Sequence, residues 1–198
     1  MPDMFDVFPV LAALITENDL YFFLLVVAAV GLGLYIRRFS GDKKGGRADR
    51  MMKEYKTLDR AALDSIPDDQ LVDAVVANLM AKLDTKNPDD YSVIPLLSRG
   101  RCAVYSIWLT CNQLNAAGLA GYLGGRAGRF AELSADGLEL IGAQQTSRII
   151  REILDARTRR PQALTLLEEE LKNAIAQERP LELCREYIRA NPDEFLDV

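Results

Sequence analysis

The chain has 198 residues, with 24 Lys and Arg against 29 Asp and Glu, a formal net charge of −5 and no histidine. The lack of histidine removes the commonest general base and the commonest metal ligand. The three cysteines are scattered, which indicates reduced, buried thiols and not a metal site. A mildly acidic balance argues against general nucleic-acid binding, which needs a basic face. We therefore expect no enzyme, no cofactor, no metal and no direct nucleic-acid contact.

Residues 20–36 form an uncharged apolar run that ends at two arginines. As a helix this run would be roughly 26 Å long, close to the thickness of a bilayer's hydrocarbon core. It predicts a single transmembrane helix, the alternative being a buried helix of a soluble protein. Tyrosines near both ends suit the membrane interfaces, and basic residues follow on one side. The residues expected to anchor the span are Leu20, Tyr21, Tyr35, Arg37 and Arg38.

The two flanks of this run carry opposite charge. Residues 1–19 hold four acids and no base, while residues 37–50 hold six bases and two acids. Because basic segments stay on the cytoplasmic side, the N-terminus should face outward and the rest of the chain should lie in the cytoplasm. The glycine-rich composition of 37–50 predicts a flexible linker, whose bases suit anionic headgroups at about 1 kcal/mol each. Membrane lipid is thus an expected partner, and the acidic tail could include an interfacial segment.

Residues 51–198 are expected to form one helical domain. The apolar residues between Leu71 and Leu83 recur at helical spacing, and Pro67 with two following acids predicts the start of that helix. No stretch alternates with period two, so the fold class is all-α: a single N-terminal transmembrane helix followed by a multi-helix cytoplasmic domain. Further helices are expected at 101–112, at 130–141 closed by Gly142, around 149–154 and 164–175, and at 181–190.

Residues 112–128 hold five glycines after an aromatic helix. One interpretation is a phosphate-binding loop assisted by Arg126 and Arg129; the other is a tight helix–helix corner. The segment lacks the G-K-[ST] ending of a Walker A loop and no strand precedes it. Polar and aromatic side chains near this corner are the least explained by core packing. They are the candidate interaction residues Arg99, Arg101, Asn112, Asn115, Tyr122, Arg126 and Arg129, while Trp108 is assigned to the core.

The same corner carries a family resemblance. An apolar helix leads into an Asn-containing turn, then small residues and Tyr122; a later helix ends in Ile141–Gly142, and residues 187–195 read Tyr-Ile…Pro-x-x-Phe. Over about residues 65–196 this order resembles a bacterial all-helical family of unknown function that includes a DNA-mimic protein. The family's segment E-V-N-N-G-G-F-x-Q-[FY] would align with residues 113–122. Asn115, Gly118 and Tyr122 match it, while Gln113, Ala116, Ala117 and Gly121 depart from it.

The resemblance implies an all-helical, non-enzymatic interaction module, with a homodimer as an open alternative. DNA mimicry needs a dense acidic face, yet residues 51–198 carry 18 bases against 23 acids. The first hypothesis is therefore a membrane-anchored accessory or scaffold subunit that binds a protein partner, such as an integral-membrane complex, at a bacterial inner membrane. The alternatives are sequestration of a DNA-binding regulator by mimicry, and a phosphate-ligand or enzymatic role at the Gly121–Gly128 corner.

Overall fold

The computed structural model describes residues 46–83, 94 and 97–197. The expected transmembrane helix, its anchoring residues, the acidic tail and most of the linker lie outside these residues. Within the described part, no helix combines the length and the apolar character needed to cross a bilayer. The chain divides into two units, Met1–Gly46 and Arg47–Val198, and the second is described below.

Every regular element among the described residues is helical, which confirms the all-α class. The α-helices are α3 (Arg47–Glu54), α4 (Arg60–Ser65), α5 (Leu71–Met80), α6 (Arg99–Gly124), α7 (Ala131–Leu140), α8 (Gln144–Arg159), α9 (Leu164–Glu178) and α10 (Pro180–Ala190). Short 3-10 helices are η2 (Arg126–Phe130), η3 (Pro161–Ala163) and η4 (Pro192–Phe195).

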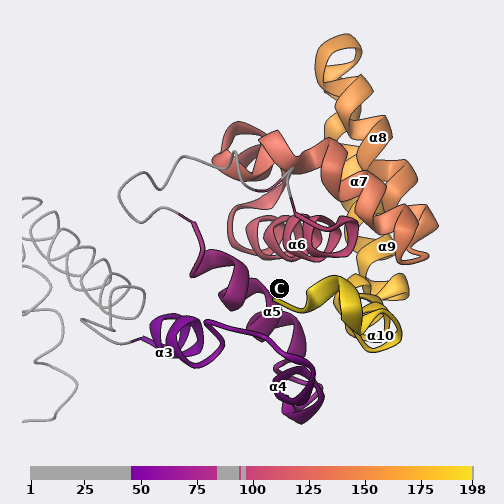
Figure 1. Cartoon of the computed structure of the whole chain (residues 1–198). Helices are drawn as coiled ribbons and strands as arrows, with labels where there is room; N and C mark the ends of the chain where they lie inside the picture. Colours follow the sequence, from indigo (N-terminus) through magenta and orange to yellow (C-terminus); the bar gives the residue numbers. More distant parts are fainter. Residues whose placement is uncertain (1–45, 84–93, 95–96, 198) are drawn as a thin grey trace, which may run out of the picture. The chain divides into compact units, whose positions relative to one another are not determined.

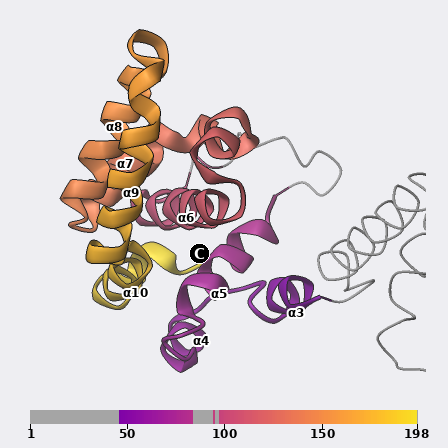
Figure 2. The same ribbon diagram turned by 180° about the vertical axis from the view of Figure 1, so that it is seen from behind.

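Helix α6 lies at the centre of this unit, as Figures 1 and 2 show. On one side α7 packs against α6, α8 against α7, and α9 against α8. On the other side α5 packs against α6, and α3 packs against α5. Helix α10 contacts both α5 and α6, so it packs across the boundary between them.

The close approach of α6 and α7 depends on a small residue. Gly137 on α7 faces Ala103, and a Cβ atom at Gly137 would lie 2.9 Å from the Ala103 Cα atom. Any side chain there would push the helices apart. Such close contact buries the apolar and aromatic first half of α6, which places this helix in the core.

Several sequence predictions are confirmed at helix ends. Gly142 has φ +90° after α7, and the Ala143 N–H donates to the Leu138 carbonyl at 2.8 Å, the arrangement of a glycine-terminated helix. The last helix begins at Pro180, one residue before the predicted start. The start predicted at Pro67 is wrong by four residues: α5 begins at Leu71, and residues 67–70 form a turn in which the Gln70 N–H donates to the Pro67 carbonyl.

Two further boundaries differ from the prediction. Residues 47–50, assigned to the linker, form the first turn of α3. The helix expected at 101–112 runs on to Gly124, so most of the glycine-rich corner is helical. Alanine and leucine between the glycines have strong helix propensity, and the single break falls at Gly118, whose φ is +65°.

Candidate functional site

Two of the seven candidate interaction residues are buried. Arg101 is 7 % exposed, and its Nη2 donates to the Phe195 carbonyl at 2.5 Å and to Asp197 Oδ1 at 2.7 Å. Tyr122 is 1 % exposed, with its hydroxyl 3.0 Å from Thr110 Oγ1. The structure therefore places both side chains in the packing of the domain, where no partner can reach them without unfolding.

The other five candidates are exposed but do not gather in one place. Arg99 lines a cleft between α6 and α7, whereas Asn112 faces α3 and α5, and Asn115 faces α9. Arg126 and Arg129 lie on η2. The predicted residues thus border several different surfaces, because α6 is long and presents its sides to different neighbours.

The glycine-rich corner is closely packed at its end. A Cβ atom at Gly125 would come within 2.7 Å of the Gly121 carbonyl oxygen, and one at Gly128 within 2.7 Å of the Leu123 carbonyl oxygen. These contacts are with backbone, which cannot give way. They support the interpretation of a tight corner over that of an open loop around a phosphate.

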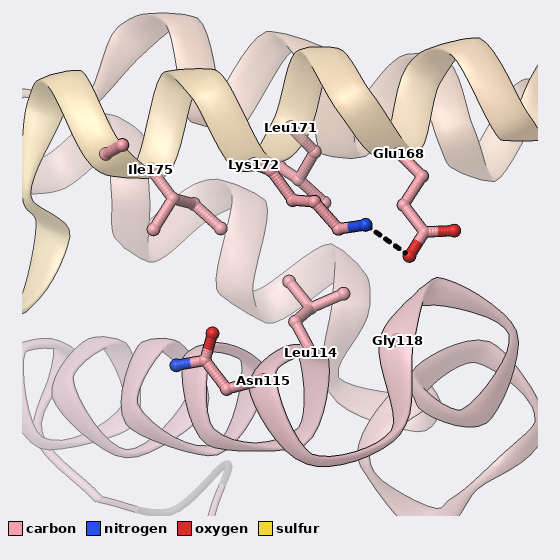
Figure 3. A pocket seen from close by; sticks show the side chains of 8 residues that line it. Leu114, Asn115, Gly118, Glu168, Leu171, Lys172 and Ile175 are labelled. Carbon is pink, nitrogen blue, oxygen red and sulfur yellow. Dashed lines mark ion pairs between the residues drawn. The ribbon is translucent and has the colours of Figure 1, made fainter.

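The break at Gly118 opens a cleft between α6 and α9 (Figure 3). Glu168 on α9 accepts a hydrogen bond from the Leu119 N–H at 3.2 Å, and Lys172 Nζ lies 3.2 Å from Glu168 Oε1. The Leu119 N–H, followed by Lys172, lowers the pKa of Glu168. The cleft measures about 460 Å³ and includes Asn115. Glu168 and Lys172 already pair with each other, and Glu168 caps the part of α6 that begins again at Leu119.

A second cleft lies where α5 and α10 begin. We call it the acidic cleft; it measures about 230 Å³ and is lined by Asp68, Asp69, Val72, Asp73, Trp108, Leu181, Glu182 and Arg185. Four carboxylates and one guanidinium thus line the cleft, and three arginines outside the lining, Arg47, Arg179 and Arg189, pair with its carboxylates. Asp73 and Glu182 sit in the first turns of their helices, where the positive end of the helix dipole stabilises a carboxylate.

Three of the four carboxylates of the acidic cleft form ion pairs with arginines: Asp68 with Arg189, Asp73 with Arg47, and Glu182 with Arg179 and Arg185. Arg189 Nη2 lies 2.8 Å from Asp68 Oδ1, and the side chain of Asp68 is 66 % exposed. Asp73 Oδ1 accepts a hydrogen bond from Trp108 Nε1 at 3.1 Å. Asp69 is exposed. No set of acidic, cysteine or histidine side chains in the described part of the chain is arranged to hold a metal ion. Carboxylates accept charge-assisted hydrogen bonds from cationic groups such as Arg and Lys side chains.

An apolar groove of about 370 Å³ adjoins the acidic cleft. We call it the methionine groove, and its lining residues are Arg47, Ala48, Met51, Met52, Asp73, Val76, Ala77, Met80, Trp108 and Asn112. Asp73 and Trp108 belong to both the groove and the cleft. The two hollows therefore share a wall.

The surface of α7 and α8 also carries ion pairs. Arg151 on α8 pairs with Asp136 at 2.9 Å and with Glu139 at 2.6 Å, while Arg159 pairs with Asp155 at 2.9 Å. Acids and bases there neutralise each other. Asp69 of the acidic cleft differs from these carboxylates, because it is exposed and belongs to no ion pair among the described residues.

The sequence contains weak signals for the acidic cleft. Pro67 with its two acids predicts a helix start, and Pro180 with Glu182 stands at the beginning of the helix predicted at 181–190. Neither pattern by itself indicates a binding site. Trp108, assigned to the core, is partly buried and packs against it while lining both hollows. That the two helix starts meet beside this indole depends on the tertiary fold.

The comparisons with known proteins give one match. No curated protein and no solved structure matches the chain. A protein-family model described as DMP19-like protein matches residues 96–196, which covers α6 to η4 and includes the Asn115–Tyr122 segment and the Tyr187–Phe195 segment. The predicted resemblance is confirmed over this range: the chain belongs to the DMP19-like protein family.

Proposed function

We propose that the chain is a protein-binding module of the DNA-mimic kind, whose acidic cleft receives Arg and Lys side chains of a DNA-binding protein. The observation that carries this proposal is the gathering of four carboxylates at the starts of two helices. Asp69 is exposed, and Asp68, Asp73 and Glu182 form surface ion pairs, which are weak enough for a cationic side chain of a partner to replace. Carboxylates at such a surface take the place that DNA phosphates occupy on the partner, because both accept charge-assisted hydrogen bonds from Arg and Lys.

Family membership supports the DNA-mimic role over the role of an accessory subunit whose partner is unspecified. The family is named for DNA mimic protein 19. Residues 96–196 nevertheless hold thirteen acids and thirteen bases, so the matched region as a whole does not imitate the charge of DNA. Asp68, Asp69 and Asp73 precede that region. Mimicry in this chain therefore rests on a small surface that residues outside the family match help to form.

Membrane attachment by residues 20–36 completes the proposal. Its support is the sequence pattern alone: an apolar run of bilayer length between an acidic and a basic flank. A binding domain held at the cytoplasmic face of a bacterial inner membrane would sequester its partner away from the chromosome. No catalytic step is part of this role.

The binding role is tested with the tagged full-length chain, extracted gently and used to capture proteins from its own cells at low salt. Any captured DNA-binding protein is then placed on labelled DNA, and increasing amounts of the chain are added. We expect the DNA to be displaced. The variant Asp69→Asn/Glu182→Gln should displace it at least tenfold less effectively, whereas the control Glu169→Gln/Glu170→Gln removes the same charge from α9 and should not. Equal displacement by both variants would reject the acidic cleft.

The attachment is tested separately by fractionation. The full-length chain should remain with membranes after washing at high salt and alkaline pH, and a variant lacking residues 20–36 should be released. An N-terminal epitope tag should be accessible from the outer side of the membrane. Recovery of the unaltered chain in the soluble fraction would exclude the attachment and leave the binding role standing.

A further inference from the structure

We propose that a cleft between α6 and α7 binds a single-chain amphipathic carboxylate, that is, an alkyl chain with one negative charge at its end. We call it the leucine cleft; it measures about 340 Å³ and is lined by Leu97, Arg99, Cys102, Ala103, Leu133, Asp136, Gly137 and Leu140. This volume lies within the range of small-molecule sites, roughly 300–1,000 Å³. The proposal goes beyond the binding role of the acidic cleft, with which the leucine cleft shares no residue.

The packing of α6 against α7 forms the floor of the leucine cleft. The two helices lie side by side (Figure 1), and Gly137 on α7 faces Ala103 on α6 in close contact. These two small residues are buried, whereas Leu97, Leu133 and Leu140 are only partly buried. The cleft is thus bordered by apolar side chains that a ligand can still cover. Hydrocarbon placed there removes apolar surface of both the ligand and the chain from water.

Arg99 gives the leucine cleft an unpaired positive charge. Its side chain is exposed and forms no ion pair among the described residues. The basic residues of other clefts differ in this respect, because Lys172 beside α9 pairs with Glu168 and Arg47 in the methionine groove pairs with Asp73. Arg99 therefore has its hydrogen-bonding capacity available for an anion that comes from outside the chain.

The carboxylates around the leucine cleft already have other partners. Asp136, which lines the cleft, lies 2.9 Å from Arg151 Nη2. Glu194 accepts a hydrogen bond from the Gly100 N–H at 2.6 Å on one oxygen and from the Tyr187 hydroxyl at 2.7 Å on the other. A guanidinium binds a carboxylate through two parallel charge-assisted hydrogen bonds. A ligand carboxylate would supply the acidic partner that the chain itself does not give to this guanidinium.

The lining also selects the rest of the ligand. One guanidinium matches one negative charge, which favours a carboxylate over a phosphate group that carries two. Apart from its two charged residues, the cleft presents leucines, small residues and the Cys102 thiol, which donates to the Ile94 carbonyl at 2.8 Å. It offers no hydroxyl or amide side chain to the backbone of a bound peptide, and polar groups buried without partners are costly. An alkyl chain has no such groups.

The site is tested with octanoate that carries a photoreactive diazirine in its alkyl chain. The full-length chain is placed in nanodiscs of phosphatidylcholine, which has no net charge, and is irradiated with the probe; mass spectrometry of the peptides then locates the crosslinks. We expect the crosslinks to concentrate on residues 97–103 and 133–140. Excess decanoate should reduce them at least tenfold, whereas decanol, which has the chain without the charge, should reduce them less than twofold.

Competitors of different length test the apolar half of the site. Hexanoate, octanoate and decanoate carry the same charge, so a difference between them reports on the alkyl chain. The concentration needed for half-maximal competition should fall at least threefold for each added pair of methylene groups, because each buried methylene strengthens binding by up to about fourfold. Equal competition by the three would show that the chain is not bound and would overturn the proposal.

Variants assign the two halves to their residues. Arg99→Gln should reduce crosslinking at least fivefold, and Arg99→Lys, which keeps the charge, should reduce it no more than threefold. Arg157→Gln is the matched control, because Arg157 is also exposed and forms no ion pair among the described residues. Leu133→Gln should reduce crosslinking about tenfold, with Leu166→Gln as its control, since Leu166 is 66 % exposed on α9. Thermal unfolding checks that each variant is folded; if Leu133→Gln is not, the competitor series decides.

The outcomes bear on the leucine cleft alone. Equal competition by decanol and decanoate, crosslinks spread evenly over the chain, or an undiminished yield in Arg99→Gln would each overturn the proposal. A short peptide ending in leucine that competes at lower concentration than decanoate would also overturn it and make the cleft a peptide site. The variant Asp69→Asn/Glu182→Gln should crosslink like the unaltered chain. If the attachment test finds the chain soluble, the same measurements are made in buffer, so the result does not depend on residues 20–36.

Discussion

The guanidinium of Arg101 and the carboxylate of Asp197 form a buried ion pair, 2.7 Å between Nη2 and Oδ1, that ties the end of the chain to α6. Asp197 also accepts hydrogen bonds from the Leu58 N–H and from Asn78 Nδ2, each at 2.9 Å, and pairs with Lys82. One carboxylate thus joins α6, α5 and the segment before α4. This network explains why Phe195 is completely buried so near the end of the sequence.

Replacement of Asp197 by Asn should strongly destabilise the domain. The change leaves Arg101, whose side chain is 8 % exposed, without a counter-ion, and removal of one member of a buried pair commonly costs about 3 kcal/mol or more. The control is Asp193→Asn: Asp193 pairs with Arg60, but its side chain is 89 % exposed, so its loss should cost less than about 1 kcal/mol. Urea unfolding followed by circular dichroism measures both. Equal free energies of unfolding would show that the network contributes little.

The same carboxylate predicts a dependence of stability on pH. Burial alone raises the pKa of Asp197, but hydrogen bonds from Lys82, the Leu58 N–H, Arg101 and Asn78 outweigh it and hold the pKa well below its usual range. The pKa of Asp197 in the folded chain lies below the unfolded value of about 3.9. The contribution of this carboxylate to the free energy of unfolding is therefore fully present above about pH 3.9 and is lost progressively as the pH falls below it.

The stability difference between the unaltered chain and Asp197→Asn should therefore be constant from pH 7 to pH 5 and shrink below pH 4. Urea unfolding at several pH values measures this difference. The variant Asp193→Asn serves as the reference, since its difference from the unaltered chain should remain small throughout. A deficit for Asp197→Asn that stays unchanged at pH 3 would contradict the proposed origin of the pKa shift.

Gly118→Ala should disrupt the break in α6. With φ +65° and ψ −175°, Gly118 occupies a region that is essentially reserved for glycine, and other residues there cost about 1–3 kcal/mol. The new Cβ atom would also lie 3.2 Å from Glu168 Oε1, the oxygen that accepts the Leu119 N–H. Gly124→Ala is the control, because a Cβ atom there meets nothing within 4 Å. Only the first variant should lower the melting temperature.

Helix periodicity predicted most of the fold, because the apolar stripes of α5, α8 and α9 face the core directly. The course of α6 was missed for a physical reason. Five glycines within 112–128 suggested a loop, but between Asn112 and Gly124 only Gly118 adopts a positive φ. Every glycine can adopt a positive φ, so the sequence alone does not show which of them does. Tertiary packing against α9 decides the position of the break.

The candidate site was harder to predict from the sequence than the fold. Arg101 and Tyr122 were expected at a surface, and both are buried because they form long-range contacts with Asp197 and Thr110. Buried polar groups are retained when such partners satisfy them, and a partner 96 residues away leaves no local pattern. The acidic cleft combines residues 68–73 with 181–185, so it too exists only in the folded chain.

Tyr122→Phe should reduce stability without affecting binding. The hydroxyl groups of Tyr122 and Thr110 lie 3.0 Å apart in the core, and loss of one leaves a polar group that is 2 % exposed without this partner. We expect a loss of about 1–2 kcal/mol in the free energy of unfolding. Displacement of DNA from a captured partner should remain at the level of the unaltered chain. A large loss of displacement in a folded variant would return Tyr122 to the interaction surface.

The three cysteines should be unreactive in the folded chain. Cys102, Cys111 and Cys184 are free and buried, as the sequence predicted, and burial raises the pKa of all three thiols, that of Cys111 to about 11. Because the thiolate is the reactive form, a disulfide reagent at pH 8 should modify them slowly in buffer and rapidly in urea. Rapid modification of one thiol in the folded chain would show that its helix opens locally, and mass spectrometry would identify which. Cys184 is the decisive position, because α10, which carries it, also supplies Glu182 to the acidic cleft.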